Sequence, residues 1–158
     1  MFMIKVQIAT QKMSVFDQGM LIREYNVSTG KNGAGELFGS EQTPRGLHVI
    51  RAKIGAGCAP NTVFVGRRPT GEVYMPELRV KFPERDWILT RIFWLSGLEK
   101  GKNRLGNVDT MRRYVYIHGA PDDVAMGIPG SRGCIRMRND DIIELFSLIP
   151  VGTQIEIW

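Results

Sequence analysis

Short runs of alternating apolar and polar residues recur along the chain, and glycine-rich stretches separate them. The runs IKVQI, LHVIRAKIG and TQIEIW alternate with a period of two residues, which is typical of strands with one buried face. Further strands are predicted for MSVFD, GMLIREYNVS, TVFVG, GEVYM and YVYIHG, which are rich in β-branched and aromatic residues. TGKNGAGELFGSEQTPRG is a predicted loop. The pattern therefore favours a mainly β fold of many short strands.

Turn and helix signals refine this prediction. A hairpin is predicted around Gln18-Gly19, and a second one with RRPTG as its turn. The segment DWILTRIFWLSGLE is ambiguous between strand and helix. One helix is predicted after Asn139, which is a favoured N-cap residue, and Pro150 ends it. We predict a mainly β chain with minor α content, in one domain over residues 1–158, with its helix in the C-terminal half.

Composition excludes several classes of protein. The net charge is +5, but the basic residues are scattered and no basic run alternates with stacking aromatics, which argues against nucleic-acid binding. Two cysteines are too few for a disulfide framework. No run approaches the roughly 20 apolar residues of a membrane helix, so no membrane insertion is expected. The N-terminus has no secretion signal, which predicts a cytoplasmic protein if Met1 is the native start and a periplasmic or cell-envelope protein if the chain is trimmed.

One glycine-rich loop carries a His at one end and a Cys at the other. His118 ends the strand YVYIHG, and Cys134 lies in SRGCIR. A nucleophilic cysteine needs a base, donors for an oxyanion and a lowered pKa. His118 could take the thiol proton while the Gly119 carbonyl fixes its tautomer, and Arg132 and Arg136 would favour the thiolate. A buried structural cysteine and histidine are the alternative interpretation.

The other candidate residues favour structural roles. Cys58 has small neighbours and no nearby base, and His48 alternates with apolar residues in LHVI, which places it facing out of a sheet or lining one. The two His and two Cys show no CxxC or HxxxH spacing, so a zinc site is not supported. Trp87 is expected in the core, whereas Trp94 is equally compatible with the core and with a substrate-facing lid.

Three segments together resemble the YkuD family of L,D-transpeptidases: IHGAP, MGIPGSRGCIRMRNDDIIELF and PVGTQIEIW. The family pattern is His-Gly, then Ser/Thr-x-Gly-Cys, with Arg or Asn two positions on. VSTGK at 27–31 and TPRGLHVI at 43–50 resemble its upstream segments, so the match runs in order from about Ile4 to Trp158. The resemblance implies a β-sandwich of short mixed strands with one helix packed on it.

The resemblance also implies an activity on peptidoglycan. A cysteine attacks the bond between the third residue of a tetrapeptide stem, usually meso-diaminopimelate, and D-Ala, and an acyl-enzyme thioester forms. By position Cys134 is the implied nucleophile, His118 the base and the Gly119 carbonyl its orienter. Oxyanion donors would be the N–H groups of Gly133 and Cys134. The implied supporting residues are Ser131 for the loop, Arg132 and Tyr116 for substrate, and Arg136 for either the loop or a substrate carboxylate.

The chain departs from many members of the family at Arg132, where they have His. Arginine is not a base at neutral pH, so Arg132 is expected to hold the anionic stem peptide instead. The partner is a peptidoglycan stem peptide or a soluble muropeptide, and no metal or organic cofactor is implied. The sequence leaves the oligomeric state open.

The sequence motif does not identify the molecule that accepts the acyl group from the cysteine. Water would make the protein an L,D-carboxypeptidase of murein recycling, which the apparent lack of a secretion signal favours. An amine would make it a periplasmic L,D-transpeptidase that forms 3–3 cross-links or exchanges D-amino acids. A non-catalytic murein-binding module is a further alternative. A thiolate in an open oxyanion site is also expected to be acylated by carbapenems.

Overall fold

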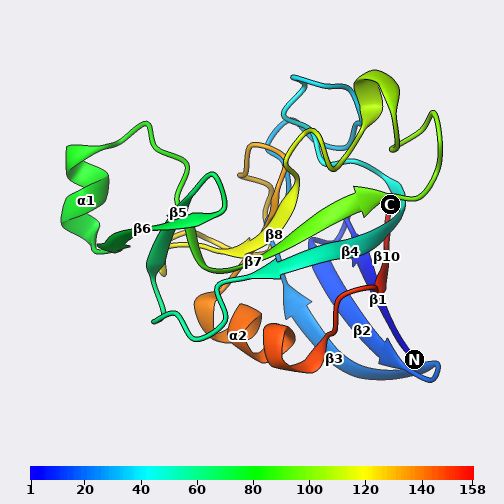
Figure 1. The fold of residues 1–158 in the computed structure, drawn as a ribbon, viewed down its shortest axis with the longest axis horizontal. Coiled ribbons are helices and arrows are strands. Elements are labelled where there is room, and N and C mark those ends of the chain that lie inside the picture. Colours follow the sequence, from blue (N-terminus) through cyan, green and yellow to red (C-terminus); the bar gives the residue numbers. More distant parts are fainter.

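Ten strands join into one hydrogen-bonded sheet in the computed structural model, which describes residues 1–158 (Figure 1). The strand order is β3-β2-β1-β10-β4-β7-β5-β6, while β8 pairs with β7 and β9. The elements in chain order are β1 (Phe2–Gln7), β2 (Lys12–Asp17), β3 (Met20–Asn26), β4 (Gly46–Ile54), β5 (Thr62–Val65), β6 (Arg68–Val73), α1 (Pro76–Lys81), β7 (Ile88–Gly97), a 3-10 turn (Gly106–Val108), β8 (Tyr116–Gly119), β9 (Ile135–Met137), α2 (Asn139–Leu148) and β10 (Gln154–Ile157).

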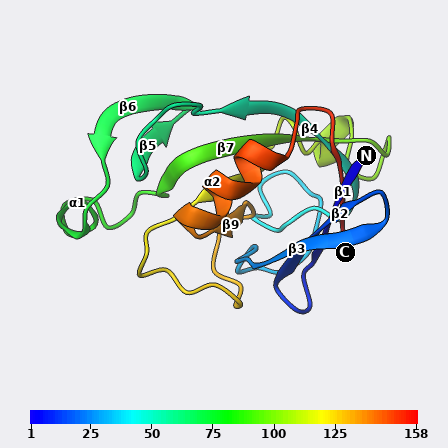
Figure 2. The same cartoon turned by 90° about the horizontal axis from the view of Figure 1, so that it is seen from below.

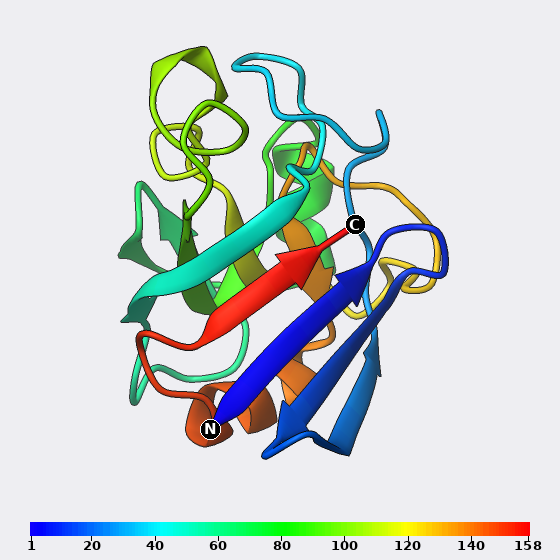
Figure 3. The same ribbon diagram turned by 90° about the vertical axis from the view of Figure 1, so that its right-hand side faces the viewer.

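The two ends of the chain are paired in the sheet. Strand β10 lies between β1 and β4, parallel to β1 and antiparallel to β4, as Figure 3 shows. The β8–β9 pair is also parallel and the remaining pairs are antiparallel, so the sheet is mixed. The fold class predicted from the sequence is confirmed, since the chain is mainly β with one main helix. Neither helix is long and apolar enough to cross a membrane.

The helix α2 covers one face of the β7–β8–β9 region (Figure 2). Side chains alternate between the faces of a strand. The core side chains on this face share a cluster with α2 and the β1–β2 strands; from β7, β8 and β9 they are Phe93, Leu95, Ile117, Ile135 and Met137. Ile142 and Leu145 of α2 are fully buried in it, and each such burial stabilises the fold by about 2 kcal/mol. The even-numbered residues of β7 from Ile92 onward, and those of β8 and β9, therefore face away from α2, whereas Thr90 contacts Asn139 at the start of α2.

The predicted elements are found, with differences at one hairpin, at the ambiguous segment, at a short helix and at the start of α2. The hairpin at Gln18-Gly19 is present, but the second hairpin turns at Gly66-Arg67, so RRPTG lies mostly within β6. The ambiguous segment is strand β7, because it hydrogen-bonds to β4, β5 and β8 at once. The short helix α1 carries no signal that the sequence analysis used.

The last difference from the prediction is at the start of α2. The helix begins at Asn139, so Arg138 occupies the N-cap position and no side chain caps it. The Asn139 side chain instead bonds to distant segments. Its Nδ2 donates to the Ala120 carbonyl, and its Oδ1 accepts from the Thr90 hydroxyl. Long-range hydrogen bonds therefore outcompeted the local capping preference.

Candidate active site

On the face of the sheet opposite α2, His118 of β8 lies near Cys134, the residue directly before β9. The β8–β9 register pairs His118 with Arg136, and Cys134 stands two residues before Arg136. Residues two apart on a strand share a face, so all three side chains are on one side. With the usual rise and spacing of strands, the Cα atoms of His118 and Cys134 are about 8 Å apart, which lets a thiol and an imidazole converge.

The loop before Cys134 is held by the segment VSTGK, residues 27–31. The backbone of Ser28 exchanges two hydrogen bonds with Arg136, and Lys31 donates its N–H to the Ser131 carbonyl. Thr43, from the TPRG stretch, accepts from the Gly30 N–H and donates to the Gly133 carbonyl at 2.9 Å. Gly133 has φ of +119°, a conformation that favours glycine. The upstream segments of the motif thus fix the shape of the cysteine loop.

His118 is fully buried, and only one of its ring nitrogens has a partner. Nδ1 lies 2.6 Å from the Gly119 carbonyl oxygen, the contact that the sequence analysis expects. That contact makes Nδ1 the protonated nitrogen and Nε2 a free acceptor, and Nε2 has no hydrogen-bond partner. A side chain at Gly119 would collide with Asn139 Oδ1 and come within 2.7 Å of the Leu89 carbonyl oxygen, so glycine is required there.

Cys134 is partly buried beneath aromatic residues. Its Sγ accepts the Tyr116 N–H at 3.3 Å and lies 3.6 Å from the Tyr114 carbonyl oxygen. Burial raises the pKa of the thiol to about 12, against the opposing effects of the Tyr116 N–H, Arg136 and Arg113. Burial likewise lowers the pKa of His118. Arg136 favours the thiolate, as expected, whereas Arg132 is not among the groups that act on the thiol. Desolvation outweighs the nearby positive charge, so the thiol stays protonated.

The resting site accordingly holds a thiol and a neutral imidazole at neutral pH. Such a pair reacts by general-base catalysis, in which the imidazole removes the proton as the sulfur attacks. The free Nε2 of His118 is the one nitrogen able to do so. The geometry therefore favours proton transfer during attack over a preformed ion pair.

Of the two expected oxyanion donors, one is already engaged. The Gly133 N–H donates to Ser131 Oγ at 3.1 Å, and that hydroxyl donates to the Cys134 carbonyl at 2.5 Å. No hydrogen bond occupies the Cys134 N–H. Ser131 thus supports the loop, and the Cys134 N–H is the donor left for a developing negative charge.

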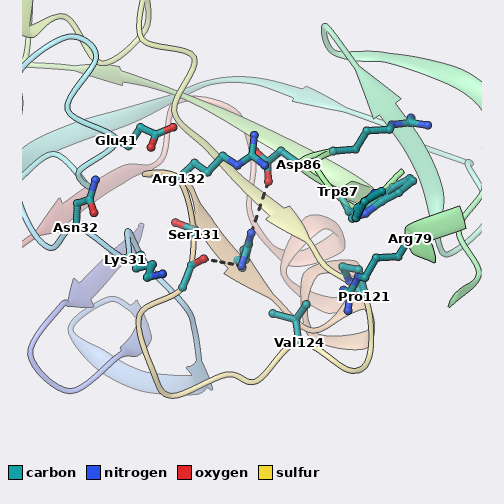
Figure 4. A pocket seen from close by; sticks show the side chains of 14 residues that line it. Lys31, Asn32, Glu41, Arg79, Asp86, Trp87, Pro121, Val124, Ser131 and Arg132 are labelled. Carbon is teal, nitrogen blue, oxygen red and sulfur yellow. Dashed lines mark hydrogen bonds and ion pairs between the residues drawn. The ribbon is translucent and has the colours of Figure 1, made fainter. Parts of the chain in front are cut away.

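A polar cleft of about 410 Å³ lies beside Arg136. Basic side chains approach it from separate segments, among them Lys31, Arg79 and Arg132 (Figure 4). Glu41 and Asp86 are its only carboxylates. The excess of positive charge suits an acidic ligand.

Asp86 is a site residue that the sequence analysis missed. It lies 3.6 Å from the Arg136 guanidinium, and its buried Oδ1 has no hydrogen bond. Its charge raises the pKa of both His118 and Cys134. The stretch ERDWI before β7 carries no motif, so nothing local distinguishes Asp86 from a surface acid.

The three residues expected to contact substrate lie in different surroundings. Arg132 is exposed at the cleft and donates to the Glu84 carbonyl, so it also ties the α1 segment to the loop. Arg136 holds the Gly130 carbonyl at 2.9 Å. Tyr116 is buried and its hydroxyl accepts from Arg67, so it forms the wall beside the thiol.

The remaining candidate residues are buried or half-buried. His48 is fully buried and both ring nitrogens have partners, so of the two expected placements it lines the sheet and does not face out of it. Cys58 packs beside the Phe64 cluster. Trp87 belongs to a small core cluster, as expected, while the half-buried Trp94 lies on the site face under Arg67, 4.2 Å from ring centre to guanidinium.

Comparison with known proteins identifies relatives over nearly the whole chain. The sequence model of the YkuD family, the L,D-transpeptidase catalytic domain, matches residues 2–157. YkuD of Bacillus licheniformis, named as an L,D-transpeptidase, is 44% identical over 156 residues, which are 99% of this chain and 65% of that protein.

Solved structures share the fold at lower identity. Bd1075 of Bdellovibrio bacteriovorus has a TM-score of 0.61 at 22% identity, covering 99% of this chain and 47% of that one. The LD transpeptidase LdtMt1, solved in complex with imipenem, has a TM-score of 0.58 at 20% identity, covering 99% and 58%. The chain thus spans less than two thirds of the length of each relative described here.

Proposed function

Because the chain belongs to the YkuD family of L,D-transpeptidase catalytic domains, we propose that Cys134 cleaves the bond between diaminopimelate and D-Ala in peptidoglycan stems. The observation that carries this proposal is the free Nε2 of buried His118, which lies on the same face as Cys134. A buried imidazole nitrogen without a partner is costly unless it serves a reacting group.

The reaction begins with attack of Cys134 Sγ on the carbonyl carbon of the scissile bond. The thiol proton passes to His118 Nε2, while Nδ1 keeps its hydrogen bond to the Gly119 carbonyl. The oxyanion accepts from the Cys134 N–H. When the carbon–nitrogen bond breaks, the proton on Nε2 goes to the leaving amine of D-Ala, and a thioester remains on Cys134.

An amine acceptor completes a transpeptidation, and this is the outcome we propose first because the relatives are named transpeptidases. Hydrolysis to a tripeptide is the second candidate. It is favoured by the polar lining of the cleft beside Arg136, which water can enter. Location follows the acceptor, since cross-linking takes place at the cell wall and hydrolysis of recycled muropeptides in the cytoplasm.

The test is mass spectrometry of a diaminopimelate-containing tetrapeptide muropeptide incubated with the protein, with and without a D-amino acid. We expect D-Ala release and an exchange product when the amine is present, whereas tripeptide in plain buffer would identify a carboxypeptidase. Cys134→Ser should abolish both products, and Cys58→Ser is the matched control. Turnover by Cys134→Ser would refute the mechanism.

A carbapenem gives an independent readout of the same thiol. The relative LdtMt1 was solved with imipenem, and we propose that Cys134 is acylated by this class of compound. The expected result is a covalent mass increase in the wild type and in Cys58→Ser, and none in Cys134→Ser.

A further inference from the structure

A second cavity, of about 440 Å³, lies on the site face near the C-terminal end of β7. Three exposed arginines line it from two segments: Arg51 of β4, and Arg104 and Arg112 of the loop before β8. None of the three guanidinium groups has an ion pair or a hydrogen bond. We call this cavity, with Arg51, Arg104 and Arg112 in its lining, the arginine pocket.

The other polar groups of the arginine pocket neutralise it only in part, because one carboxylate faces three guanidinium groups. Asp109 is its only carboxylate, and it already accepts the N–H groups of Leu105 at 2.7 Å and Arg112 at 2.9 Å. The Ser96 hydroxyl is buried there without a partner. The cavity near the C-terminus is balanced by contrast, since it combines Arg45 and Lys102 with two glutamates. The arginine pocket therefore has an excess of positive charge together with a hydroxyl that has no hydrogen-bond partner.

The sheet register places this pocket within reach of the thiol. Ser96 is two residues along β7 from Trp94, Trp94 pairs with Tyr116, and the Tyr116 N–H donates to Cys134 Sγ. At about 3.3 Å per residue and 4.8 Å per strand, Ser96 and Cys134 are about 12 Å apart. Arg67 and Arg51 both lie over the Trp94 ring, so the surface between the two sites is positive throughout.

The polar cleft and the arginine pocket lie at opposite ends of the site. The cleft adjoins Arg136 and Pro121, beyond the C-terminal end of β8, whereas the pocket adjoins Met111 and Arg112, before its N-terminal end. Cys134 stands beside Tyr116, between them. Two anion-attracting cavities on either side of one nucleophile suit a reaction that brings together two acidic molecules.

We propose that the arginine pocket binds the carboxylates of a second stem peptide, whose amine accepts the acyl group from Cys134. This inference rests on the proposed function. An extended peptide of about four residues spans 12 Å, and guanidinium groups pair with carboxylates in bidentate geometry. The amine nitrogen bonds to the thioester carbon as the carbon–sulfur bond breaks, and its proton returns through His118 Nε2 to the thiolate. Hydrolysis would need no such pocket.

The test separates acylation from transfer. The double variant Arg104→Gln/Arg112→Gln is compared with Arg68→Gln/Arg138→Gln, which removes the same charge from exposed arginines outside both cavities. With a tetrapeptide donor, we expect all proteins to release D-Ala at rates within twofold when D-alaninamide, which lacks a carboxylate, is the acceptor. Transfer to the tripeptide L-Ala-γ-D-Glu-diaminopimelate should fall about tenfold or more in the pocket variant alone.

Failure of the pocket assignment and failure of the proposed function would give different results. Normal transfer to the tripeptide by the pocket variant would overturn the pocket assignment and leave the acyl-enzyme intact. Absence of D-Ala release in every protein would instead refute the proposed function. Binding is checked by titrating the inactive Cys134→Ser protein with the tripeptide and, separately, with inorganic phosphate. Phosphate that binds the arginine pocket while the tripeptide does not would exclude a peptide as the ligand.

Discussion

The two histidines are equally buried, yet their surroundings have opposite consequences. In His48 of β4, Nδ1 bonds to the Gly46 carbonyl and Nε2 to the Thr110 hydroxyl, each at 3.0 Å. In His118 of β8, Nδ1 bonds to the Gly119 carbonyl and Nε2 has no partner. Burial lowers the pKa of both rings. The two rings differ in one nitrogen, since only His118 keeps Nε2 free, on the face that carries Cys134, as its proposed role as a base requires.

The largest expected effect tests that difference directly. Replacing His118 by Gln removes the base, so acylation of Cys134 by a tetrapeptide should slow by about 10²- to 10⁴-fold. His48→Gln is the matched control, and the acylation rate of its folded fraction should stay within about threefold of wild type. The measurement is pre-steady-state D-Ala release. Equal losses in the two variants would show that burial alone explains both residues.

A second prediction concerns stability and pH. Burial lowers the pKa of His48 to about 4 from an unfolded value of 6.5, so below pH 6.5 the unfolded chain binds a proton that the folded chain refuses. Stability therefore falls as the pH drops from about 6.5 to 4, by up to about 3 kcal/mol from this ring. His118 adds in the same direction, and above pH 6.5 neither ring contributes.

Urea unfolding at several pH values measures this effect. His48→Val should lower stability at neutral pH, because Thr110 and the Gly46 carbonyl lose a partner, but its decline between pH 6.5 and 4 should be shallower than that of the wild type. Nearby carboxylates such as Glu36, whose pKa is lowered by Arg45, act alike in both proteins. Identical declines would show that His48 already titrates normally in the fold.

The smallest effect on rate is expected at Asp86. Its charge favours a protonated His118 but opposes a thiolate at Cys134, so the two influences on proton transfer partly cancel. Asp86→Asn should change acylation by less than about tenfold while lowering the pKa of His118, read from an NMR titration. Asp123→Asn, which breaks only the surface pair with Arg79, is the control. An unchanged His118 pKa would mean that Asp86 does not act on the ring.

Much of the fold and part of the site were predictable from local patterns. Strands such as β1 and β10 alternate because one of their faces is buried, and the pattern is visible in any short window. The segment of β7 stayed ambiguous because both of its faces are partly covered and its mostly apolar sequence shows no period of two. The prediction that Asn139 caps α2 was wrong because its side-chain amide hydrogen-bonds to Ala120 and Thr90, which are distant in the chain.

The sequence by itself determined the strand-rich class, the glycine-rich loop and the presence of His118, Gly119 and Cys134 in one motif, since each is encoded by residues close together in the chain. Only the tertiary structure decided which histidine keeps a free nitrogen, how far burial raises the pKa of the Cys134 thiol, and where Asp86 and the arginine pocket lie. Those properties arise from desolvation and from contacts between segments far apart in sequence. Desolvation and long-range contacts come into being only when the sheet closes around its core.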